Sequence, residues 1–110
     1  MTLDDLRAFG ANVDEGMARC MNMEAFYLRL VNTVKQEPHF AELFSALEAH
    51  DLDTGFKAAH ALKGVLGNLS LTPLYEPMCE LTELLRARAD VDYTELAALI
   101  RERYEAFLAL

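Results

Sequence analysis

FKAAHALKGVLGNL, residues 56–69, predicts a long amphipathic helix because alanine and leucine dominate it. Its apolar residues recur at intervals of three and four, which places them on one face of that helix. Gly64 and Gly67 conflict with the helical preference, since each glycine in a helix interior costs about 1 kcal/mol relative to alanine. We therefore expect the two glycines to serve something other than local stability. The apolar face comprises Phe56, Ala59, Leu62, Leu66 and Leu69.

The flanking sequence divides into further helices, each opened by a capping residue or ended by a helix breaker. Two short helices are predicted near the N-terminus, over about 3–9 and 13–20, and a third is predicted to be capped by Asn22. Pro38 breaks or bends that third helix. Beyond Pro38, a helix is predicted to run to about His50. Three more helices are predicted: from Asp51 or Asp53 to about Leu69, from Thr72 to about Arg88, and from Asp92 towards the C-terminus.

Pro77 leaves two alternatives open: the helix that follows Thr72 begins there, or its first turn is distorted. No stretch alternates apolar and polar residues for long enough to indicate a strand, and the connections between helices are short. We predict an all-α fold, an antiparallel four-helix bundle with short N-terminal covering helices, in a single domain over residues 1–110. Four methionines are expected to fill its core: Met17, Met21, Met23 and Met78.

Composition and charge exclude several classes of protein. The formal net charge of −8 argues against a nucleic-acid partner and against an anionic membrane surface. No apolar run approaches the roughly 20 residues of a membrane span, and the acidic N-terminus MTLDDLRAFG is unlike a signal peptide. Cys20 and Cys79 lack metal-ligand spacing, which favours reduced thiols in a cytoplasmic protein.

The predicted helix over 56–69 turns one histidine away from the core. His60 lies well outside the apolar stripe, and Lys63 and Gly64 follow it on the same surface at the spacings of neighbours along a helix. The glycines remove side chains beside the imidazole, so that another protein could approach closely. An exposed imidazole is largely uncharged at neutral pH and therefore nucleophilic. The candidate site comprises His60 and Lys63, with a surface for partners formed by Lys57, Gly64, Gly67 and Asn68.

A lone surface histidine is most often only solvated, and its neighbouring lysines could be ordinary solubilising charges. Two interior glycines on the same face, with no turn to explain them, favour a functional interpretation. His39, beside Pro38 near a helix start, and His50, near a helix end, lack such a setting and are predicted to be structural or incidental.

The run AAHALKGVLGNL resembles the H-x-L-K-G signature of histidine-containing phosphotransfer (HPt) domains, and the likeness extends over nearly the whole chain. The resemblance implies that His60 accepts a phosphoryl group from the phosphoaspartate of a receiver domain and passes it to another receiver. It implies that Lys63 helps to hold that group and that Gly64 keeps the surface open. Where the family usually has a glycine ten residues after the histidine, this chain has Ser70, which puts the local geometry at the helix end in question.

The resemblance further implies a phosphorelay carrier with no intrinsic kinase activity. Its partners would be response-regulator receiver domains, including those of hybrid sensor kinases, with no cofactor and no metal of its own. We expect a cytoplasmic monomer. An alternative is an HPt-like interaction module that binds receivers or kinases without carrying phosphate.

Two further classes fit the sequence less well. In the phospho-acceptor part of a sensor kinase the histidine is typically followed by an acidic residue, whereas His60 is followed by Ala61, and no nucleotide-binding glycine loop is present. A metal-carrying bundle needs Glu-x-x-His pairs, and none of the three histidines has a glutamate three residues before it.

Overall fold

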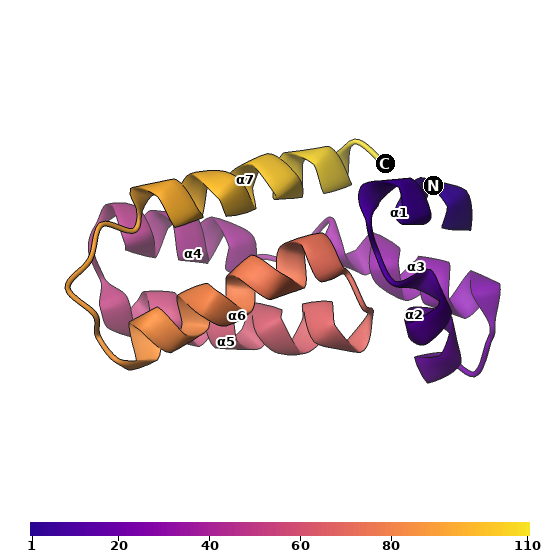
Figure 1. Cartoon of the computed structure of the whole chain (residues 1–110), viewed down its shortest axis with the longest axis horizontal. Helices are drawn as coiled ribbons and strands as arrows, with labels where there is room; N and C mark the ends of the chain where they lie inside the picture. The colour runs from indigo at the N-terminus through magenta and orange to yellow at the C-terminus, as the bar shows by residue number, and fades with distance from the viewer.

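The computed structural model describes residues 1–110, which form seven α-helices and no strand (Figure 1). The all-α prediction is therefore confirmed. The helices are α1 (Leu3–Phe9), α2 (Val13–Arg19), α3 (Glu24–Val34), α4 (His39–Glu48), α5 (Leu52–Asn68), α6 (Thr72–Arg86) and α7 (Thr94–Leu108).

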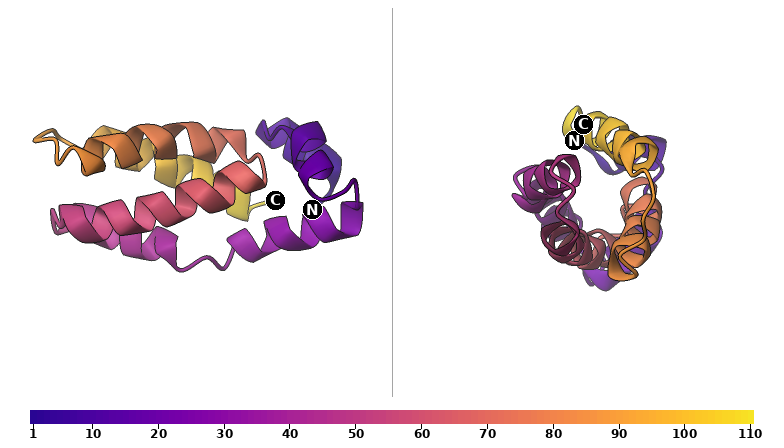
Figure 2. Two further views of the ribbon diagram at one scale, coloured as in Figure 1. Left: turned by 90° about the horizontal axis from the view of Figure 1, so that it is seen from below. Right: turned by 90° about the vertical axis from the view of Figure 1, so that its left-hand side faces the viewer.

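Helices α4 to α7 form an antiparallel four-helix bundle, and α1 to α3 cover one of its ends (Figure 1). The end-on view in Figure 2 shows the four helices arranged around a common centre. Helix α5 packs against α4 and α6, and α7 closes the bundle through the stacked rings of Phe40 and Tyr104, whose centroids lie 4.0 Å apart. The two chain termini lie close together where α1 meets α7 (Figure 1).

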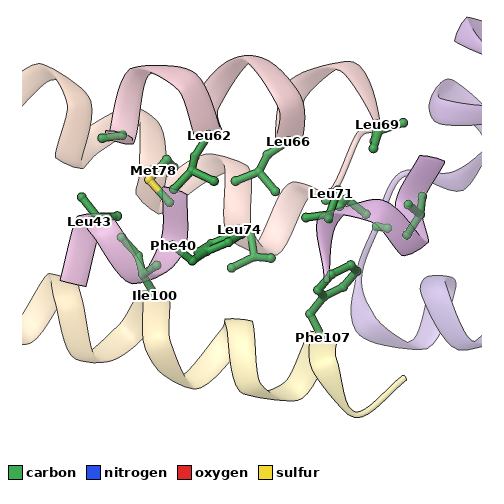
Figure 3. Packing of buried hydrophobic residues seen from close by; sticks show 14 of the residues in the cluster. Phe40, Leu43, Leu62, Leu66, Leu69, Leu71, Leu74, Met78, Ile100 and Phe107 are labelled. Carbon is green, nitrogen blue, oxygen red and sulfur yellow. The ribbon is translucent and has the colours of Figure 1, made fainter. Parts of the chain in front are cut away.

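The core of the bundle is a continuous apolar cluster of 23 buried residues. Figure 3 shows leucines of α5 and α6 meeting Phe40 of α4 and Ile100 of α7. Phe107 continues the cluster towards the covering helices, where its ring lies 5.8 Å from that of Phe9 of α1. Burial of this surface is the main favourable contribution to folding.

Pro38 lies in the non-helical segment that separates α3 from α4. Residues 35–38 are not helical, and α4 begins at His39, so that α3 extends beyond the end of the bundle (Figure 2). A proline has no N–H to donate and its ring restricts the preceding residue, which explains why the helix ends before it.

Pro77 lies inside α6, so the alternative in which the helix begins at that residue is wrong. The missing N–H of Pro77 leaves the carbonyl of Pro73 without its usual helical donor. Arg103 of α7 supplies a replacement, because its Nη1 donates to that carbonyl at 2.7 Å. A contact between two helices thus compensates for a defect within one of them.

The turn between α2 and α3 differs from the sequence-based expectation. Met21 and Asn22 adopt left-handed backbone conformations, with φ of 56° and 55°. Met23 occupies the N-cap position of α3 with no side-chain hydrogen bond, so Asn22 does not cap that helix. The turn directs two of the four methionines outward: Met21 is 74% exposed and Met23 is 54% exposed, whereas Met78 is fully buried. Their assignment to the core was wrong because a turn has no periodicity from which burial could be inferred.

Candidate functional site

Helix α5 positions the histidine singled out by the sequence. The carboxylate of Asp51 caps its N-terminus by accepting from the Thr54 N–H at 3.1 Å, and hydrogen bonds with Thr54 lower the pKa of that carboxyl. On the inner face Ala59, Leu62 and Leu66 are completely buried. The same helical geometry leaves His60 exposed.

The imidazole of His60 rests against an aromatic neighbour. Phe56, one turn earlier, stacks on it with ring centroids 5.7 Å apart and planes inclined by 21°. The guanidinium of Arg86 from α6 lies 4.9 Å from the centre of the Phe56 ring. Phe56 is half-buried, so it lies at the edge of the apolar face rather than within it, beside the imidazole.

A cation lies one turn beyond His60. The side chain of Lys63 is 31% exposed, and its ammonium lies 4.0 Å from a carboxylate oxygen of Glu83 on α6. Glu83 also forms an ion pair with Arg86, whose Nε lies 3.3 Å from its other carboxylate oxygen. An ion pair at 4.0 Å between two groups at the protein surface is worth at most about 1 kcal/mol, so the ammonium can readily exchange that partner for another anion.

The two glycines of α5 have different surroundings. A Cβ added at Gly64 would meet no heavy atom within 4 Å, so the helix surface beside His60 is bare backbone. A Cβ added at Gly67 would lie 2.8 Å from Cε1 of Tyr75. Gly67 therefore permits close approach of the Tyr75 ring, and we correct the expectation that it leaves the surface bare.

A shallow cavity of about 280 Å³ joins these features on one side of α5. It brings together five of the predicted residues from α5 with Arg19 of α2 and Tyr75 of α6, while Lys57 is exposed but does not line it. Sequence reasoning missed Arg19 and Tyr75 because they are far from His60 along the chain and no local pattern marks them. The lining residues are Arg19, His60, Lys63, Gly64, Gly67, Asn68 and Tyr75.

Ser70 occupies the position at the end of α5 where a left-handed conformation is required. Its φ is 56°, a conformation that glycine adopts without strain and serine does not. Local bonds compensate, because its hydroxyl donates to Glu15 at 3.2 Å and its carbonyl accepts from the N–H of Asn12 at 3.0 Å. Ser70 thus ends α5 in the left-handed conformation, with both its hydroxyl and its carbonyl bonded to α2 and its N-cap.

The other two histidines lie away from this site. The ring of His39 is hydrogen-bonded to Glu37 close to the break between α3 and α4. His50 adopts a left-handed conformation, with φ of 55°, directly before α5, and its ring lies 6.4 Å from that of Tyr93. Neither has an interior glycine beside it. No group of three or more His, Cys, Asp or Glu side chains is placed to hold a metal ion.

Comparison with known families identifies the class to which this bundle belongs. The profile of the Hpt domain matches residues 34–110, which include α4 to α7 and the whole of the site on α5. The chain belongs to the Hpt domain family, whose members are phosphocarrier modules of two-component signalling, and its role is of this phosphotransfer type. No curated protein sequence and no solved structure matches the chain. None of the seven helices has the length and apolar character needed to cross a membrane.

Proposed function

We propose that His60 carries a phosphoryl group between receiver domains. The unprotonated ring nitrogen attacks the phosphorus of a receiver's phosphoaspartate, forming a P–N bond. The P–O bond to the aspartate breaks, and its electron pair leaves with the carboxylate. The reverse step, to the aspartate of a second receiver, restores the free imidazole.

The observation that carries this proposal is the combination of an exposed imidazole, bare backbone at Gly64 and a cation at Lys63 on one helix surface. Phosphoryl transfer depends on alignment of the reacting groups and on compensation of charge. Stacking on Phe56 orients the imidazole. Lys63 is close enough to Glu83 to be held there and exposed enough to turn to a phosphoryl oxygen.

The receiver brings the rest of the machinery in this proposal, including its Mg²⁺, so the chain needs no cofactor and no deep pocket. We propose that Gly64 and Asn68, with Lys57 and the rim of Gly67, form the surface that meets the receiver. We further propose that residues 1–110 act as one domain, as a monomer, in the cytoplasm.

The test uses a receiver domain phosphorylated on its aspartate with radiolabelled acetyl phosphate. We expect the label to move to the wild-type chain as a phosphate that is labile in acid and stable in base. His60→Gln should abolish the transfer, whereas His39→Gln and His50→Gln should leave it unchanged. Incubation with labelled ATP alone should leave the chain unmodified.

The same variants address the alternative of an interaction module. If His60→Gln binds receivers and supports signalling as well as the wild-type chain does, the protein acts by binding alone. If the label appears on His39 or His50 instead, the assignment of the acceptor is wrong.

A further inference from the structure

Arg19 connects the N-terminal helices to the site on α5. One of its terminal nitrogens, Nη1, donates to the carbonyl of Gly67 in the last turn of α5, and Nη2 lies 2.8 Å from Oε1 of Glu15. The side chain is 48% exposed and lines the same shallow cavity as His60. These two contacts use two of the five N–H donors of a guanidinium, so the others are available to an anionic group of a binding partner.

The position of α2 against α5 is fixed by contacts that do not involve Arg19. Asn12, the N-cap of α2, donates its N–H to the carbonyl of Ser70, and the hydroxyl of Tyr27 donates to the carbonyl of Leu69 at 2.9 Å. Gly16 lets α2 pack against α3, because a Cβ at this residue would lie 2.6 Å from the ring of Tyr27 on α3, the same residue that bonds to Leu69. The backbone of Arg19 is therefore held beside the end of α5 by the packing of α2.

We propose that the receiver-docking surface extends from α5 onto α2, with Arg19 as the contact for an acidic group of the receiver. This inference rests on the proposed function and adds a residue outside the segment matched by the family profile, which begins at residue 34. Arg19 is a specificity and docking residue, and it takes no part in the chemical step.

The charge of the chain favours such a contact. The chain has a formal net charge of −8, and a protein that binds Mg²⁺ beside a phosphorylated aspartate is itself acidic around its site. Two acidic proteins repel each other unless opposite charges face them locally. The cations on or beside this surface are Lys57, Lys63, Arg19 and Arg86. Only the two arginines have the planar fork that binds a carboxylate through two hydrogen bonds, and of these Arg19 lines the cavity with His60, whereas Arg86 lies over Phe56 and pairs with Glu83.

The experiment measures docking without transfer. A receiver domain selected for binding to the wild-type chain is activated with beryllofluoride and Mg²⁺, and its Kd is measured by calorimetry at low and at high salt. We expect Arg19→Gln to raise the Kd about three- to fivefold at low salt and to weaken the salt dependence. The matched control is Arg7→Gln, since Arg7 is equally exposed and pairs with Asp4 and Asp14 but lies outside the cavity.

A second variant separates docking from a merely structural role of Arg19 at the end of α5. Glu15→Gln removes the carboxylate that competes for the guanidinium, so it should lower the Kd about twofold. The decrease should disappear when Glu15→Gln is made in the background of Arg19→Gln, because no guanidinium is then left to be freed; an equal decrease in that background would show only the removal of a negative charge. Urea unfolding of each variant establishes the folded fraction under the assay conditions.

The inference is wrong if Arg19→Gln binds the activated receiver with the same Kd as Arg7→Gln, or if Glu15→Gln does not tighten binding. If the Kd values follow the expected order but the wild-type chain accepts no phosphoryl group on His60, the proposed function is wrong and the docking contact still stands. The two failures are therefore distinguishable.

Discussion

Gly64 is the residue at which stability and function are expected to oppose each other. Because a Cβ there meets nothing within 4 Å, Gly64→Ala should raise the free energy of unfolding by about 0.5–1 kcal/mol through its better helix propensity. The added methyl group lies on the surface that a receiver must approach, so the rate of transfer to His60 should fall. Urea unfolding and the transfer assay check the two effects. Transfer at the wild-type rate would show that the bare backbone is not needed.

Among the tyrosines, Tyr27 is expected to contribute most to the loss of stability at alkaline pH. Burial, followed by the nearby Cys20, raises the pKa of its phenol from 10.0 to about 12. Above pH 10 the unfolded chain loses this proton while the folded chain retains it, so stability is complete below pH 10 and falls as the pH rises towards 12. We expect the loss to reach up to about 2–3 kcal/mol.

The measurement is urea unfolding at about pH 9 and about pH 11, with Tyr27→Phe as the control. Tyr27→Phe has no phenol to titrate, so its free energy of unfolding should fall less over this interval. An equal fall in both proteins would contradict the pKa assigned to Tyr27.

At the scale of the helix, Gly67→Ala should lower the free energy of unfolding, whereas Gly64→Ala should raise it. Gly67→Ala places a Cβ 2.8 Å from the ring of Tyr75, so either that ring or α6 must move. We expect it to lower the free energy of unfolding by about 1–3 kcal/mol, with Gly64→Ala as the matched control in the same helix. In the background of Tyr75→Ala, Gly67→Ala should be tolerated. An equally large loss in that background would mean that Tyr75 is not the cause.

The proline within α6 gives a second test at this scale. Arg103→Met removes the donor to the carbonyl of Pro73 and should cost about 1–2 kcal/mol. Pro77→Ala restores an N–H that can reach the same carbonyl, so Arg103→Met should cost less in that background. A double-mutant cycle by urea unfolding measures the coupling. Strict additivity would show that Arg103 does not compensate for the proline.

At the scale of the whole molecule, much of the bundle could be predicted because burial follows helical periodicity. The stripe of leucines along α5, the exposure of His60 and the helix starts at Asp51 and Thr72 are all consequences of local sequence. The prediction for Pro77 remained ambiguous because the compensating donor, Arg103, is 30 residues away on another helix.

The rest of the site depends on tertiary packing that local patterns do not encode. Arg19 and Tyr75 reach the cavity because α2 and α6 meet the end of α5, and Glu83 meets Lys63 for the same reason. Gly67 and Gly64 are both glycines of α5. Only the contact with Tyr75 of α6 shows that Gly67 serves packing.

Phosphorylation of one identified ring is the most direct test of the central claim. The chain is labelled with ¹⁵N in its histidine rings, mixed with a phosphorylated receiver, and followed by ¹H–¹⁵N spectra of the imidazoles together with ³¹P spectra. We predict a new phosphoramidate ³¹P signal and a shift of the ring nitrogens of His60 alone, with His39 and His50 unchanged. A receiver that loses its phosphate to water while the His60 resonances stay where they were would contradict the account.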